Sequence, residues 1–196
     1  MNIYYEGDTG KIYWRKAGHV VYFNLEKMDW DMADCSDEKW AAEHLIPGNT
    51  NVMQITEEQA MLRLEGQILD NLDREELHKY IEMLCQNRQI GWGSEEEQSN
   101  LAFLQGDYHY PPDLYNIFGI LGSDHEYRFH MATWPENLMP TDMDLWQIRT
   151  ALTYIIEEER FDTDIIAQAA DDGTLLKLLL RLDDLLNVRR GRRQHW

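Results

Sequence analysis

The sequence predicts an α+β fold, with an N-terminal antiparallel β-meander and a helical C-terminal half. Residues 2–25 alternate aromatic or β-branched side chains with polar ones between turns rich in glycine, which is typical of hairpins. Residues 141–188 carry apolar side chains at helical spacings of three and four. Because 196 residues suffice for one well-filled core, we expect a single acidic domain. It spans residues 1–188, β-rich over 1–55 and helix-rich over 56–188, and a flexible arginine-rich tail follows over 189–196.

Three strands are expected at the N-terminus. Residues 2–6 and 11–15 flank a turn at 7–10, and residues 19–25 follow a second turn. The next stretch, 26–40, mixes carboxylates with aromatic residues. It predicts a loop that leads into a short helix over 36–44, with Ser36 as its cap, and then a short strand over 51–55.

Two helices are expected in the middle of the chain. Thr56 and Gln59 form a capping box at the start of the first, and Asp73 caps the second, which runs to Gln89. Another helix is expected over 94–104. The segment 105–139 is the least regular: Pro111 and Pro112 favour an extended or turn conformation, and residues 125–134 alternate like a strand.

Three helices are expected in the C-terminal block. Thr141 and Asp144 form a capping-box-like start to the first, Asp162 or Thr163 caps the second, and Gly173 ends it. The third begins near Thr174. Its leucines predict either the most buried helix of a monomer or the interface of a homodimer: Leu175, Leu178, Leu179, Leu182, Leu185 and Leu186.

Charge is the strongest compositional signal, since 36 acidic and 18 basic residues give a net charge of −18. Such a protein repels nucleic acid and anionic membranes and attracts basic surfaces, although the charge can also serve solubility alone. The sequence shows no signal peptide and no run near the roughly 20 apolar residues of a membrane span. We therefore expect a cytoplasmic protein. Cys35 and Cys85 stand outside any Cys-x-x-Cys motif, and no cofactor or metal is expected.

One pattern suggests an enzyme. Asp113 is followed, after 12 intervening residues, by Glu126, Tyr127 and Arg128. This resembles the core motif of the restriction-like nuclease families, in which an Asp and a Glu on adjacent strands hold a divalent metal and a Lys helps to activate water. The resemblance implies a small metal-dependent nuclease or hydrolase, with Asp107 and His130 as further candidates. Arg128 stands in the place of the Lys, and a guanidinium cannot act as a base.

A second pattern suggests binding. Carboxylates on an exposed element can imitate the phosphate row of a nucleic acid, while Trp30 and Trp40 could anchor a partner. The alternative is a charged solvent face with both tryptophans in the core. The candidate partner-binding residues are Asp29, Trp30, Asp31, Asp34, Asp37, Glu38, Glu95, Glu96 and Glu97.

These observations favour a non-enzymatic acidic interaction protein. It is expected to bind and block a basic, nucleic-acid-handling protein or nucleoprotein complex, without contacting nucleic acid itself. Phage-encoded inhibitors of bacterial defence, anti-CRISPR proteins among them, are often small, acidic and without motifs, and the chain resembles them in this. Immunity proteins and antitoxins fit the same description and remain an alternative, as does the metal-dependent enzyme.

Overall fold

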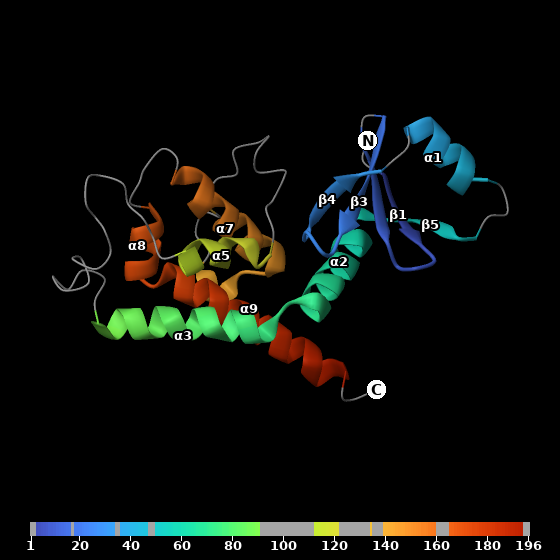
Figure 1. Ribbon diagram of the computed structural model, residues 1–196. Coiled ribbons are helices and arrows are strands. Elements are labelled where there is room, and N and C mark those ends of the chain that lie inside the picture. Colours follow the sequence, from blue (N-terminus) through green and yellow to red (C-terminus); the bar gives the residue numbers. More distant parts are fainter. Residues whose placement is uncertain are drawn as a thin grey trace. The chain divides into compact units, whose positions relative to one another are not determined.

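The structure is a computed structural model that describes residues 3–16, 18–33, 36–46, 50–90, 112–121, 134, 139–159 and 165–193 (Figure 1). An antiparallel sheet comes first and helices follow, so the predicted α+β class is confirmed. The chain divides into two compact units, Met1–Asn71 and Leu72–Trp196. We call them the sheet unit and the helical unit. That residues 1–188 form one domain stays a prediction.

The sheet unit is built on five antiparallel strands in the order β4-β3-β2-β1-β5. The three strands of the predicted meander and the short strand after them are confirmed. The fourth strand corrects the sequence analysis, which expected a loop there. Trp30 packs edge-on against Phe23 on one face of the sheet, and Asp29 and Asp31 point to the other, which is the alternation of a strand. The strands are β1 (Ile3–Gly7), β2 (Ile12–Lys16), β3 (His19–Asn24), β4 (Asp29–Met32) and β5 (Val52–Ile55).

One helix covers each face of this sheet. Helix α1 (Asp37–His44) buries Trp40 against Tyr5 and Val20. Helix α2 (Glu57–Asn71) covers the other face, where Glu57 accepts a hydrogen bond from the hydroxyl of Tyr4. Each helix is also tied to a strand by an ion pair: Asp37 of α1 with Arg15 of β2, and Arg63 of α2 with Glu6 of β1.

The expected caps and one tight turn position these elements. The hydroxyl of Ser36 accepts from the backbone N–H of Lys39, and Thr56 and Gln59 form both hydrogen bonds of the capping box. Gly18, between β2 and β3, has a φ of 82°, a left-handed conformation that glycine adopts without strain.

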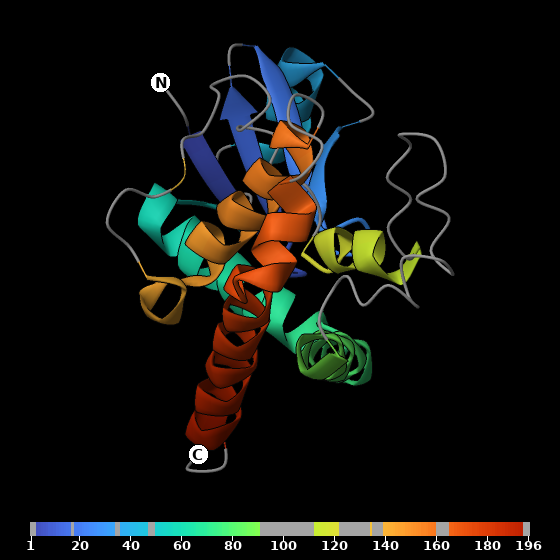
Figure 2. The ribbon, with the colours of Figure 1, turned by 90° about the vertical axis from the view of Figure 1, so that its left-hand side faces the viewer.

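The helical unit is organised around its last helix. This helix, α9, packs against α3, α7 and α8, and Leu175, Leu178, Leu179 and Leu182 have no exposed surface. Figure 2 shows α9 along its length with the end of α3 beside it. No helix among the described residues is long and apolar enough to cross a membrane. The elements are α3 (Arg74–Ile90), α5 (Pro112–Gly119), the 3-10 helix η1 (Pro140–Asp142), α7 (Leu145–Glu158), α8 (Ile165–Asp171) and α9 (Thr174–Arg193).

Two expectations for this unit are corrected. Pro112 begins helix α5 rather than an extended segment, because proline lacks an N–H that a first helical turn would leave unbonded in any case. Thr141 lies in η1, and the capping box of α7 is formed by Asp144 and Gln147. Helix α9 continues through Arg193, within the expected arginine-rich tail, and the flexibility of that tail stays a prediction.

Other expectations for this unit are confirmed or concern residues outside the described part of the chain. Asp73 caps α3 by accepting from the backbone N–H groups of Glu75 and Glu76. Gly173, with a φ of 78°, ends α8 as expected. The helix expected over 94–104, the strand expected over 125–134, and Asp162 and Thr163 lie outside the described residues.

Candidate functional site

Four of the predicted partner-binding carboxylates lie on one side of the sheet. Asp31 is opposite Tyr22 in the register, and Tyr22 is opposite Tyr13, whose ring packs against Trp40 of α1. Asp29 and Asp31 therefore lie on the face that α1 covers, at the outer strand β4. Asp37 and Glu38 form the first turn of α1 itself. We call these four residues, Asp29, Asp31, Asp37 and Glu38, the acidic edge.

Part of the acidic edge already has partners within the chain. Asp31 accepts hydrogen bonds from Lys27 Nζ and from Asn24 Nδ2, both at 2.8 Å. Asp37 and Arg15 form a bidentate ion pair with N···O distances of 2.5 and 2.7 Å. The hydrogen bond from Arg15 lowers the pKa of Asp37, and the pKa of Arg15 is raised in return. Glu38 is exposed, so it remains accessible to a partner.

The two tryptophans are not exposed anchors. Trp40 is 2% exposed and belongs to the core, which confirms the alternative interpretation for this residue. Trp30 is half-buried, with its ring centroid 5.4 Å from those of Trp14 and Phe23 on the face opposite the acidic edge. The apolar group that β4 does expose is Met32, at 59%. Met32 alternates with Asp31 along β4, so it points to the same face as Trp30, and the acidic edge offers charge rather than an apolar anchor.

The residues of the nuclease-like pattern do not form a described site. Asp113 lies in the first turn of helix α5, whereas the motif needs an Asp on a strand. Within the described residues, no group of three or more His, Cys, Asp and Glu side chains is arranged to hold a metal ion. Several predicted residues lie outside the described part of the chain: Asp34, Glu95, Glu96, Glu97, Asp107, Glu126, Arg128 and His130.

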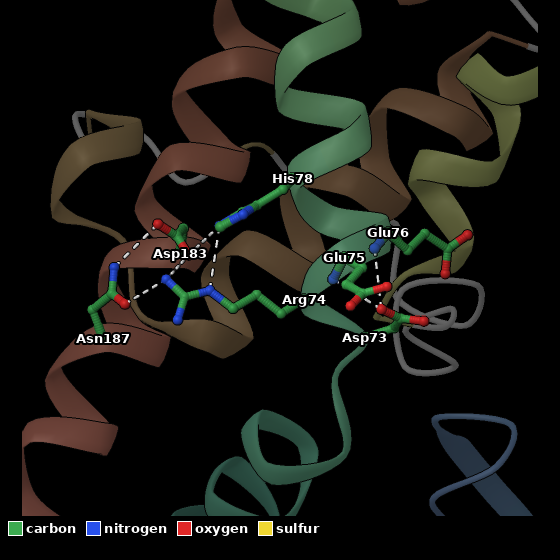
Figure 3. A network of polar contacts seen from close by, with 7 residues as sticks. All are labelled: Asp73, Arg74, Glu75, Glu76, His78, Asp183 and Asn187. Atoms are coloured by element: carbon green, nitrogen blue, oxygen red, sulfur yellow. Dashed lines mark hydrogen bonds and ion pairs between the residues drawn. The ribbon is translucent and has the colours of Figure 1, made fainter.

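A polar cluster between α3 and α9 escaped the sequence analysis. Arg74 donates to Asp183 at 3.1 Å and to Asn187 at 2.7 Å, and His78 Nε2 lies 3.0 Å from Asp183 Oδ1 (Figure 3). Burial acts to raise the pKa of Asp183, but the hydrogen bond from His78 and the charge of Arg74 outweigh it and lower the pKa. The only available signal was the i, i+4 spacing of Arg74 with His78 and of Asp183 with Asn187, which does not say that the two pairs meet.

This cluster links helices α3 and α9 through polar contacts, and the role of His78 in it depends on the tautomer. His78 Nε2 also lies 3.3 Å from Arg74 Nε, and one ring nitrogen cannot accept from the guanidinium and donate to Asp183 at once. Its two roles therefore alternate with the tautomer. The side chain of His78 is 46% exposed and that of Asp183 is 20% exposed. The described contacts of this cluster join α3 to α9.

Comparison with known proteins places the helical unit in a family. No curated protein and no solved structure matches the chain. Residues 69–188 match the model of a family of unknown function, DUF6508. The match covers more than half of the chain, including all four residues of the α3–α9 cluster, and leaves the acidic edge outside. The chain therefore belongs to the DUF6508 family, through its helical unit and the last residues of α2.

Proposed function

We propose that this protein is a non-enzymatic interaction protein whose acidic edge binds a basic segment of a nucleic-acid-handling partner and thereby blocks it. The observation that carries the proposal is the position of the acidic edge: Asp29 and Asp31 lie on an outer strand of the sheet, and the exposed Glu38 lies in the first turn of α1, the helix that covers the same face. An outer strand keeps backbone N–H and C=O groups on its far side that can pair with a strand from another chain.

Charge would give this pairing its selectivity. Asp29 and Asp31 project from alternate positions of β4 to the same side, so a partner strand with Lys or Arg at alternate positions places them opposite the carboxylates. Asp31 would then share its charge between Lys27 and the partner. With a net charge of −18, the chain attracts basic surfaces over a distance that salt shortens, so binding should be fast and salt-dependent.

This proposal has two specific forms, which differ in the class of partner that is bound. An inhibitor of bacterial defence, anti-CRISPR-like in its action, binds a nucleoprotein complex, and an immunity protein or antitoxin binds a toxin. Both would use the same acidic edge. The metal-dependent nuclease or hydrolase receives no support from the described residues, since Asp113 begins a helix.

The test is affinity capture from the host lysate at low and high salt, followed by mass spectrometry and calorimetry with the purified partner. A double variant, D29K/E38K, should weaken binding at least about tenfold, because it replaces attraction by repulsion at the contact. The matched control is E58K/D70K, which makes the same change in net charge at two exposed positions of α2. Glu58 lies in the first turn of that helix and Asp70 in its last turn, so their effects on the helix dipole oppose each other.

Comparison of the two variants decides whether the acidic edge binds the partner. Retention of a basic nucleic-acid-handling protein by the wild type and the control, with loss in D29K/E38K, supports the proposal. Equal loss in both variants would assign binding to net charge alone, and equal retention in both would remove the acidic edge from consideration.

A further inference from the structure

The sheet unit contains a cavity of about 500 Å³. It lies where the β1–β2 turn, Thr9–Lys11, and the end of β3 meet Gln67 of α2. Gln67 donates a hydrogen bond of 2.7 Å to the carbonyl oxygen of Gly10, which fastens that turn to the helix. Cavities that hold small ligands typically measure about 300 to 1,000 Å³, so this one has the size of a ligand site.

Lys11, on the wall of this cavity, differs from the other described basic side chains of the sheet unit. Its Nζ lies 3.3 Å from the ring centroid of Tyr22 and 5.8 Å from that of Tyr13, and none of the described carboxylates pairs with it. This is notable in a chain with twice as many acidic as basic residues. The other four each have a carboxylate partner: Arg15 with Asp37, Lys27 with Asp31, Lys39 with Glu43 and Arg63 with Glu6.

The remaining walls restrict what an anion in this cavity could be. Tyr22, Phe23 and Leu25 are among the residues that line it, so an apolar or aromatic body would contact apolar surface there. Glu26 also lines it and repels negative charge. One lysine facing one glutamate favours a ligand with a single negative charge over a doubly charged phosphate.

We propose that this cavity binds a small organic carboxylate with an aromatic or aliphatic body, and that the ammonium of Lys11 binds its carboxylate. Lys11 is half-buried, and its ammonium gains a charge-assisted hydrogen bond that no described carboxylate supplies. Tyr22 holds the lysine in place by a cation–π contact, so little side-chain entropy is lost when the ligand enters. This site adjoins the acidic edge, because Asp31 and Asp29 lie opposite its lining residues Tyr22 and Asn24, but it does not depend on the proposed function.

The experiment is an NMR titration of the full-length protein with phenylacetate and with phenylacetamide, its neutral counterpart of the same shape. Phenylacetate should produce saturable shifts at the backbone amides of Gly10 and Leu25 and at the side-chain amide of Gln67. It should bind at least about tenfold more tightly than phenylacetamide, since only the acid gains the ion pair.

Variants assign the preference to Lys11. Lys11→Met should abolish the difference between acid and amide, and Lys11→Arg, which keeps the positive charge, should preserve it. Lys39→Met removes an exposed lysine of the same unit and should have no effect. The titration uses the purified protein without any partner, so its result is independent of partner binding.

Three outcomes would overturn the proposal. They are the absence of saturable shifts at ligand concentrations up to about 10 mM, equal affinity for the acid and the amide, and an unchanged preference in Lys11→Met. If Lys11→Met does not give a folded spectrum, the wild type and Lys11→Arg still decide through the comparison of the two ligands.

Discussion

The sheet unit and the helical unit are held together in different ways. In the sheet unit, aromatic side chains fill both faces and each covering helix is fixed to a strand by an ion pair, Arg15–Asp37 on one side and Glu6–Arg63 on the other. In the helical unit, leucines of α9 supply the core, and the polar cluster of Asp183 joins α3 to α9 at a partly exposed position. In the sheet unit, strand register and ion pairs therefore fix the positions of the elements. In the helical unit, the packing of apolar side chains does so. The family match belongs to the second unit and both proposals to the first.

The largest expected effect is that of Trp40→Ala. Trp40 is 2% exposed and contacts Tyr5 and Tyr13, so its removal leaves a cavity and should lower the free energy of unfolding by about 3–5 kcal/mol. Urea unfolding followed by NMR measures the loss for each unit separately. The single-domain prediction requires the signals of the two units to disappear together, and separate transitions would contradict it.

In the helical unit, Leu179→Ala should cost about 2–5 kcal/mol, because Leu179 is fully buried in the core around α9. Leu180→Ala is the matched control on the same helix, since Leu180 is 45% exposed and its loss should change stability little. Thermal unfolding and size-exclusion chromatography measure both. A Leu179→Ala protein that keeps its stability but changes its oligomeric state would place this leucine at an interface between chains.

The smallest effect is expected for the polar contacts, and it depends on pH. The folded-state pKa values of Asp37 and Asp183 are lowered from the usual range of an aspartate, so the unfolded chain takes up protons first as the pH falls. Their contribution, on the order of 1 kcal/mol each, is complete above about pH 4 and is lost as the pH drops through the folded pKa.

Asp37→Asn and Asp183→Asn test this in the two units. Each should lower the urea midpoint at pH 7 and reduce its further fall between pH 4 and pH 2, whereas Asp184→Asn, at an exposed position, should do neither. A variant that loses as much stability on acidification as the wild type would show that its carboxylate does not contribute in this way.

Local signals in the sequence predicted much of this fold. The hairpin at 7–10, the caps at Ser36, Thr56 and Asp73, and the end of α8 at Gly173 each depend on residues within a few positions. Strand β4 was missed because two of its four residues are carboxylates, a composition that is typical of loops. In the structure these carboxylates share one face of an outer strand. Pro112 was misread because proline both breaks helices and begins them.

The candidate sites were harder to predict, because they depend on contacts between distant residues. Arg74 and Asp183 are 109 positions apart, and nothing in either segment indicates the other. The sequence left the positions of Trp30 and Trp40 open, since an aromatic residue among carboxylates fits a core and an interface equally well. Only the register shows that Asp29 and Asp31 share a side with α1, and only the fold brings Lys11 to a cavity that Gln67 also lines.

The backbone conformation at Gly18 determines which chirality a replacement residue must have. A β-carbon built on this residue would meet no atom within 4 Å, so space is not what requires glycine there. With a φ of 82°, the requirement lies in the backbone alone, which L-amino acids resist and their mirror images adopt readily. Gly18 thus stands where a D-residue would fit. D-alanine at this position would keep the junction of β2 and β3 and restrict the unfolded chain, whereas ordinary alanine would strain the folded one.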